Sequence, residues 1–136
     1  MLRDGEAVSF GLWASHAAAR VRAALEGLNP RGSEARVQVT LAAAMHRAGI
    51  VFEREVEIIP RGGRLHFDRI DFLVGDGPGL EVKIEGSRAE VLRQLDRYAE
   101  SPRIAHLMLV TTRAQLHTMP KELREKPLEV LYLCPL

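Results

Sequence analysis

Three side chains in the middle of the chain, Asp71, Glu81 and Lys83, have the types and spacing that metal-assisted hydrolysis uses. Asp71 lies within the apolar run Ile70–Val74, where a carboxylate is costly unless a cation or hydrogen bonds compensate it. Glu81 and Lys83 are two residues apart in a short strand-like segment, so their side chains leave the same face. Carboxylates on neighbouring strands repel unless something positive lies between them, and Mg²⁺ or Mn²⁺ prefers such oxygen ligands. Lys83 would then lie within reach of an attacking water.

The elements that must position these residues follow from changes in the hydrophobic period. Apolar positions at helical spacing predict a helix over 13–28. A second helix is expected from the N-cap Ser33 to about Gly49. Three short strands separated by glycine-containing turns then form an antiparallel meander. These strands cover residues 51–59, 65–74 and 80–84, and the turns cover residues 60–63 and 75–79.

In the second half of the chain, helices and strands alternate. Ser87 and Glu90 form a capping box that begins a helix, which ends before Ser101–Pro102. The next strand is almost uniformly apolar, as expected for a strand covered on both faces. The remaining predicted elements are this strand over 104–111, a short helix over 120–126 and a last strand over 128–134. The buried stripes of the two longer helices are expected to be Val37, Leu41, Ala44, Met45 and Ala48, and then Val91, Leu92, Leu95, Tyr98 and Ala99.

The order α-α-β-β-β-α-β-α-β predicts an α/β fold with a central mixed sheet flanked by helices. We divide the chain into an N-terminal helical appendage over 1–32 and one α/β domain over 33–136. The appendage is expected either to pack against the sheet or to mediate a homodimer.

Composition narrows the class of protein. The chain has 136 residues and a formal net charge of +1, which excludes a strongly basic, histone-like binder. Its single cysteine, Cys134, excludes an internal disulfide framework and a multi-cysteine zinc site. No apolar run approaches the roughly 20 residues that a membrane span needs. We therefore expect no membrane association and a cytoplasmic location.

Asp71, followed after nine residues by Glu81-Val82-Lys83, resembles the signature of the PD-(D/E)xK phosphodiesterase superfamily. That superfamily shares a restriction-endonuclease-like α-β-β-β-α-β core, and the elements predicted for 33–111 have this order. The resemblance implies that Asp71, Glu81 and the main-chain carbonyl of Val82 hold Mg²⁺ (or Mn²⁺). It implies that Lys83 positions or deprotonates the attacking water, or steadies the charge on the phosphate. Ile70 stands where the named pattern has a proline.

Two further matches strengthen the resemblance. Glu34 opens the helix before the meander, where many members of the superfamily place a glutamate that faces the metal. Alternatively, Glu34 complements the helix dipole as an ordinary first-turn acid. Gln94 and Tyr98 resemble the Q-x-x-x-Y element of RecB-type nucleases, in which the glutamine contacts water or substrate at the site. Alternatively, Gln94 is an exposed glutamine beside a packed tyrosine.

The resemblance implies a Mg²⁺-dependent nuclease that hydrolyses DNA, with an endonuclease or resolvase-like activity favoured over an exonuclease, and that works as a homodimer. The alternative is a catalytically inactive nucleic-acid or protein interaction module that retains the fold. In that case Glu81 and Lys83 form a partly buried ion pair, and Asp71 is tied to an arginine such as Arg69 or Arg36.

Arginines near the predicted site offer contacts to a phosphate backbone. Arg88, Arg93 and Arg97 lie on the exposed side of the helix that follows the catalytic strand, and Arg113 and Lys121 come later. The alternative is a solvated helix face on which these arginines pair with neighbouring acids.

Other ionisable residues are predicted to be structural. Asp68 should leave the face of its strand opposite to Asp71, as a solvated or edge charge. His106, within an apolar strand, is interpreted as a core histidine. A solvated row that protects a sheet edge is expected from Glu53, Glu55 and Glu57.

Overall fold

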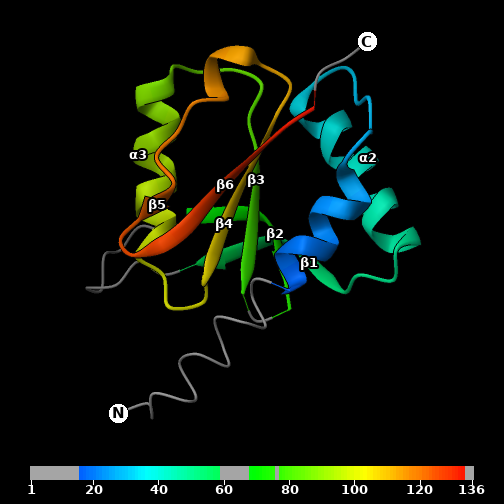
Figure 1. Cartoon of the computed structure of the whole chain (residues 1–136), viewed down its shortest axis with the longest axis horizontal. Coiled ribbons are helices and arrows are strands. Elements are labelled where there is room, and N and C mark those ends of the chain that lie inside the picture. Colours follow the sequence, from blue (N-terminus) through cyan, green and yellow to red (C-terminus); the bar gives the residue numbers. More distant parts are fainter. Residues whose placement is uncertain (1–15, 59–67, 76, 134–136) are drawn as a thin grey trace.

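The computed structural model describes residues 16–58, 68–75 and 77–133, and these form an α/β fold in which helices flank a six-stranded mixed sheet (Figure 1). Residues 16–25 are helical and precede the labelled elements. The labelled elements are α2 (Glu34–Arg47), β1 (Phe52–Ile58), β2 (Asp68–Val74), β3 (Pro78–Val82), α3 (Arg88–Ala99), β4 (His106–Thr111), the 3₁₀ turn η1 (Ala114–Leu116), β5 (Glu122–Leu123) and β6 (Lys126–Tyr132). The predicted α/β fold with a central mixed sheet flanked by helices is confirmed.

The sheet has the strand order β1-β2-β3-β4-β6-β5. β1, β2 and β3 pair antiparallel, so the predicted meander is confirmed. β3, β4 and β6 pair parallel, and α3 is the crossover that parallel β3 and β4 require. This crossover places α3 over the strands that carry Asp71 and Glu81.

Two hydrophobic clusters lie on opposite faces of the sheet. α2 and the helix at 16–25 cover one face, and α3 covers the other (Figure 1). Every residue of β4 is buried, because Met108 and Val110 pack into the first cluster while Leu107 and Leu109 pack into the second. The almost uniformly apolar sequence of this strand therefore reflects cover on both faces.

Both longer helices begin at the predicted caps. Ser33 Oγ accepts a hydrogen bond from the Arg36 N–H at 3.2 Å, and Ser87 Oγ accepts one from the Glu90 N–H at 3.2 Å. The predicted buried stripes are also correct, except that Ala48 is the exposed C-cap of α2 and Leu92 is only half-buried. Among the described helices, none is both long and apolar enough to span a membrane.

The predicted helix over 120–126 is wrong. β5 and the start of β6 form a hairpin instead, with Leu123 paired to Lys126 and positive φ angles of 50° and 67° at Arg124 and Glu125. Positive φ at both central residues is the signature of a tight two-residue hairpin turn. Helix propensity is a weak preference, and strand pairing at the sheet edge overrides it here. The turn 60–63, the predicted strand residues 59, 65–67 and 134, residues 13–15 and Asp76 lie outside the described residues.

The helix at 16–25 packs against the sheet, which is one of the two expected arrangements. Ala18, Val21 and Leu25 are fully buried in the cluster that contains α2. Arg22 pairs with Glu129 on β6, and His106 Nε2 lies 3.5 Å from Glu129 Oε1. The hydrogen bond from Arg22 lowers the pKa of Glu129, and burial lowers the pKa of His106. His106 is buried, as predicted, but neither of its ring nitrogens has a hydrogen-bond partner among the described residues.

Two valines of α2 test the assignment of its buried face. Val37 is 1% exposed and Val39 is 61% exposed. We expect Val37→Ala to lower the free energy of unfolding by about 2 kcal/mol, because it removes two buried methyl groups and leaves a cavity. Val39→Ala should change this free energy by less than about 0.5 kcal/mol, since the site is exposed and alanine favours helix. Urea denaturation of both variants measures the difference, and equal effects would contradict the assignment.

Candidate active site

Asp71 and Glu81 meet where the pairing of β2 and β3 stops. The antiparallel ladder joins Leu73 to Gly79 and Phe72 to Leu80, and one residue further the same register sets Asp71 opposite Glu81. At that point the carboxylates of these two residues, rather than main-chain carbonyls, accept the hydrogen bonds from N–H groups of the opposite strand. The Asp71 N–H donates to Glu81 Oε1 at 3.2 Å, and the Val82 N–H donates to Asp71 Oδ2 at 2.8 Å. Each carboxylate thus binds the main chain of the neighbouring strand, and the two carboxyl groups lie between the strands.

The alternation of side chains along β2 breaks at Asp71. Ile70 packs on the α3 side of the sheet, whereas Phe72, two residues later, packs on the α2 side. In a regular strand these two residues would share a face. Glu55, opposite Asp71 in the register with β1, has a positive φ of 53°. The sheet is therefore locally distorted at the position where Asp71 approaches Glu81.

Burial dominates the electrostatics of this pair. Glu81 is 3% exposed, and burial, followed by the negative charge of Asp71, raises its pKa well above the usual value. Burial also raises the pKa of Asp71, although the hydrogen bond from the Val82 N–H opposes this shift. The two carboxyl groups lie close enough to hydrogen-bond when one of them carries a proton. The pair therefore favours a proton or a cation between its oxygens.

Gln94 and Tyr98 reach the pair from α3. The Tyr98 hydroxyl lies 2.8 Å from Glu81 Oε2 and 2.9 Å from the Arg69 carbonyl, and it can donate to either. Gln94 Nε2 donates to the Tyr98 oxygen at 2.6 Å. Burial and the charge of Glu81 raise the pKa of Tyr98, so the phenol stays protonated. Gln94 therefore acts on Glu81 through Tyr98 and makes no direct hydrogen bond to either carboxylate.

Lys83 follows β3 and lies beside the pair. Its Nζ is 3.8 Å from Glu81 Oε2, and its side chain is 23% exposed. The Lys83 N–H donates to the Val110 carbonyl at 3.0 Å, so the main chain at Lys83 continues the parallel pairing with β4. The predicted placement of Glu81 and Lys83 on one face is correct, although β3 ends at Val82 rather than at Ile84.

The side chain of Glu34, the first residue of α2, reaches the end of β3 but does not contact Asp71 or Glu81. Its Oε1 accepts a hydrogen bond from the Ile84 N–H at 3.1 Å. On the other side of the same residue, Arg113 Nη1 donates to the Ile84 carbonyl at 3.3 Å. Glu34 and Arg113 thus hold the turn that carries Lys83. The contact of Arg113 with this turn was not predicted, and the only signal for it was the position of Arg113 just after a buried strand.

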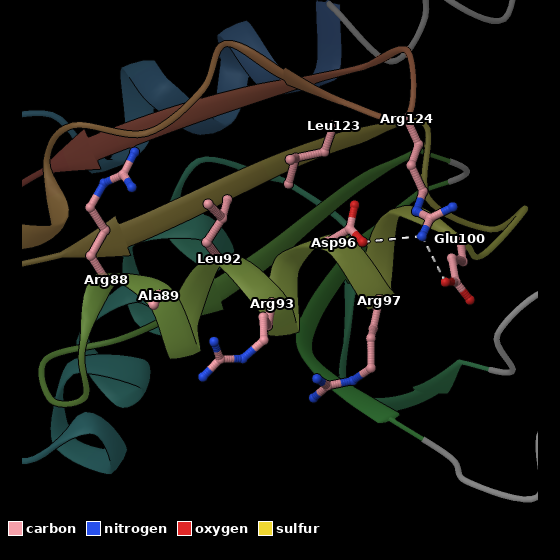
Figure 2. Close-up of a pocket in the computed structure, with 9 residues that line it drawn as sticks. All are labelled: Arg88, Ala89, Leu92, Arg93, Asp96, Arg97, Glu100, Leu123 and Arg124. Carbon is pink, nitrogen blue, oxygen red and sulfur yellow. Dashed lines mark hydrogen bonds and ion pairs between the residues drawn. The ribbon is translucent and has the colours of Figure 1, made fainter.

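Arginines lie on two sides of α3, and one of them, Arg124, comes from the turn between β5 and β6 (Figure 2). Figure 2 shows Arg93 and Arg97 on one side of the helix, whereas Arg124 lies on the other side and pairs with Asp96 and Glu100. A shallow groove of about 650 Å³ runs over this solvent-facing surface between α3 and β5. Tyr98 points to the opposite, buried side of α3, so the groove is separate from the carboxylate pair.

Asp68 differs from its predicted environment. It is not a solvated charge: its side chain is only 15% exposed, and Oδ2 lies 3.3 Å from Arg97 Nε. α3 covers this end of β2 and supplies the arginine, which a pattern within β2 alone does not reveal. The row of Glu53, Glu55 and Glu57 is exposed on the edge strand β1, as predicted.

The donor set of the site consists of oxygens. Within the described ranges no cluster of three or more histidine, cysteine, aspartate or glutamate side chains converges as a metal site. The available donors are the carboxylates of Asp71 and Glu81 and the main-chain carbonyl of Val82. Mg²⁺ commonly binds through one or two carboxylates and keeps several waters or substrate phosphate oxygens. The residues present therefore fit a hard divalent ion that shares its coordination with solvent or substrate.

Comparison with known proteins adds no relative. No protein-family model, no curated protein and no solved structure matches the chain. The contacts described above are therefore the basis of the function proposed below.

The raised pKa of Glu81 has a consequence for stability. Between the ordinary glutamate pKa of 4.5 and the raised pKa, the folded protein binds more protons than the unfolded chain. The stability of the metal-free protein should therefore fall as pH rises through this window. We expect Glu81→Gln to raise the melting temperature at neutral pH, with a difference that shrinks below pH 4.5.

Melting curves across this pH range, recorded with chelator, measure the effect. The control is Glu57→Gln, because Glu57 is an exposed glutamate that pairs with Arg69 on the edge of the sheet. A neutral-pH melting temperature of Glu81→Gln below that of the wild type would show that the charged form of Glu81 is not the destabilising one.

Proposed function

We propose that the chain is a metal-dependent nuclease that hydrolyses DNA phosphodiester bonds. The observation that carries this proposal is the convergence of Asp71 and Glu81 between β2 and β3, with Lys83 Nζ 3.8 Å from Glu81. A buried carboxylate, Glu81, beside a half-buried one, Asp71, is costly for a structural role alone. They are an appropriate set for holding a divalent ion next to a phosphate.

The order of elements supports the same proposal. α2, β1, β2, β3, α3 and β4 follow one another, and β4 pairs parallel with β3. We propose that this is a restriction-endonuclease-like core and that the chain is similar to the PD-(D/E)xK superfamily. Asp71 on β2 and the Glu81-Val82-Lys83 segment on β3 then take the places of the superfamily's signature.

We propose Asp71, Glu81 and the Val82 carbonyl as ligands of Mg²⁺ or Mn²⁺. When bound, the ion would lower the pKa of water and offset the charge that develops on the phosphate. Asp71 and Glu81 already carry raised pKa values because their charges are buried together, and a cation would compensate these charges. The hydrogen bonds from the Asp71 and Val82 N–H groups orient the carboxylates before any ligand arrives.

The other side chains have distinct roles in this proposal. The Lys83 ammonium would position the attacking water or stabilise negative charge on the phosphate from the solvent-accessible side of the pair. Tyr98, supported by Gln94, is a positioning residue, because its hydroxyl reaches Glu81 Oε2. Glu34 positions Lys83 indirectly, through the Ile84 N–H.

A second candidate function is an inactive interaction module. The Lys83–Glu81 contact at 3.8 Å favours it, because an ion pair could satisfy Glu81 without a metal. The module also predicted that an arginine such as Arg69 pairs with Asp71. Arg69 pairs with Glu57 instead, which does not support the module. Metal binding and cleavage distinguish the two functions.

Cleavage tests the role of Lys83. We expect the wild type to cleave duplex, single-stranded or branched DNA with Mg²⁺ or Mn²⁺ and not with chelator. Lys83→Ala should fold normally and cleave at least ~100-fold more slowly, the scale of losing an acid–base or electrostatic group. Arg47→Ala, which removes the same charge from the exposed end of α2, should cleave like the wild type. Wild-type cleavage by Lys83→Ala would contradict the assigned role.

Metal titration tests the two carboxylates. We expect Mn²⁺ to bind the wild type in titration calorimetry, and Asp71→Asn and Glu81→Gln to abolish this heat because each removes a charged ligand. Glu53→Gln changes an exposed acid on the edge strand β1 and should bind Mn²⁺ normally. Normal Mn²⁺ binding by Asp71→Asn and Glu81→Gln would favour the interaction module.

A further inference from the structure

Arg113 is a half-buried cation that follows β4. Its N–H donates to Thr111 Oγ1 at 3.0 Å, and its Nη1 donates to the Ile84 carbonyl at 3.3 Å. The first bond fixes the main chain after the strand, and the second draws the side chain toward the turn after β3. The guanidinium is thereby held next to the residue that follows Lys83.

The strands place this arginine at the proposed site. β3 and β4 are parallel neighbours, with Val82 opposite Val110, so the residues that follow these strands lie at the same end of the sheet. The Lys83 N–H donates to the Val110 carbonyl, which continues this pairing. Ligands of sheets with parallel strands commonly bind outside the carboxyl ends of the strands.

The charge of Arg113 has no acidic counterpart in the described part of the chain. Arg22, Arg69, Arg97 and Arg124 each pair with an aspartate or glutamate. For Arg113, the side-chain contact is a neutral carbonyl, which uses one of the five N–H donors of a guanidinium. A half-buried charge held in this way is arranged to receive an anion.

We propose that Arg113 binds a backbone phosphate of the DNA strand next to the bond that is cleaved. The guanidinium would bridge the Ile84 carbonyl and a phosphate oxygen, and its remaining N–H groups match phosphate geometry. This inference rests on the proposed nuclease function and adds a substrate contact outside the metal ligands and Lys83.

Arg103 provides a matched control. It precedes β4, whereas Arg113 follows it, so the two arginines lie at opposite ends of one strand. Arg103 Nη1 also donates to a main-chain carbonyl, that of Glu57, at 3.4 Å. Substituting either arginine removes the same charge and the same kind of hydrogen bond, but only Arg113 lies beside Lys83.

The test is fluorescence anisotropy with a short labelled duplex and the matching single strand, in chelator so that no cleavage occurs, over a series of salt concentrations. We expect Arg113→Ala to weaken binding of the preferred DNA at least about tenfold. The slope of log affinity against log salt should fall by about one, as for loss of a single phosphate contact. Arg103→Ala should match the wild type in both affinity and slope.

Arg113→Gln guards against a purely structural effect. The glutamine amide can still donate to the Ile84 carbonyl but carries no charge, and circular dichroism checks its fold. We expect it to bind as weakly as Arg113→Ala. Wild-type affinity and slope in Arg113→Gln, or equal losses in Arg103→Ala, would overturn the role of Arg113 while leaving the nuclease function intact. If the wild type neither binds nor cleaves any DNA, the proposed function itself fails, and the role of Arg113 fails with it.

Discussion

The repulsion between Asp71 and Glu81 is the constraint on which the rest of the site depends. Two carboxylates occupy a position where main-chain pairing of β2 and β3 would otherwise continue, and each accepts an N–H from the opposite strand. Burial raises both pKa values, so the arrangement is costly in the absence of a compensating cation. Lys83 and the Tyr98 hydroxyl offset part of this cost, and the proposed metal ion would offset the remainder.

The fold brings support to this pair from both faces of the sheet. α3 crosses from β3 to β4 and delivers Tyr98 to the Glu81 carboxylate, while α2 delivers Glu34 to the turn after β3. Arg113 approaches the same turn from the end of β4. One crossover and one preceding helix therefore fix both the carboxylates and the main chain that carries Lys83, so the site is organised by rigid elements (Figure 1).

Local patterns were enough to predict the main elements and the convergence of the pair. Period-two alternation placed Glu81 and Lys83 on one face, and the serine caps located both longer helices. Contacts between distant residues were beyond these patterns: the bond from Ile84 to Glu34 spans fifty residues. The break in alternation at Asp71 lies opposite the positive φ of Glu55 in the neighbouring strand, which the pattern of β2 alone does not reveal. The segment that includes Arg124 was predicted as helix, but pairing with β6 decides its structure.

Crystals soaked in Mn²⁺ and measured for anomalous scattering test the central claim most directly, because they locate the ion itself. The account predicts one strong peak between the Asp71 and Glu81 carboxylates and close to the Val82 carbonyl. A fully soaked crystal with no peak there, or with its principal peak at other residues, would contradict a metal-dependent site at this pair.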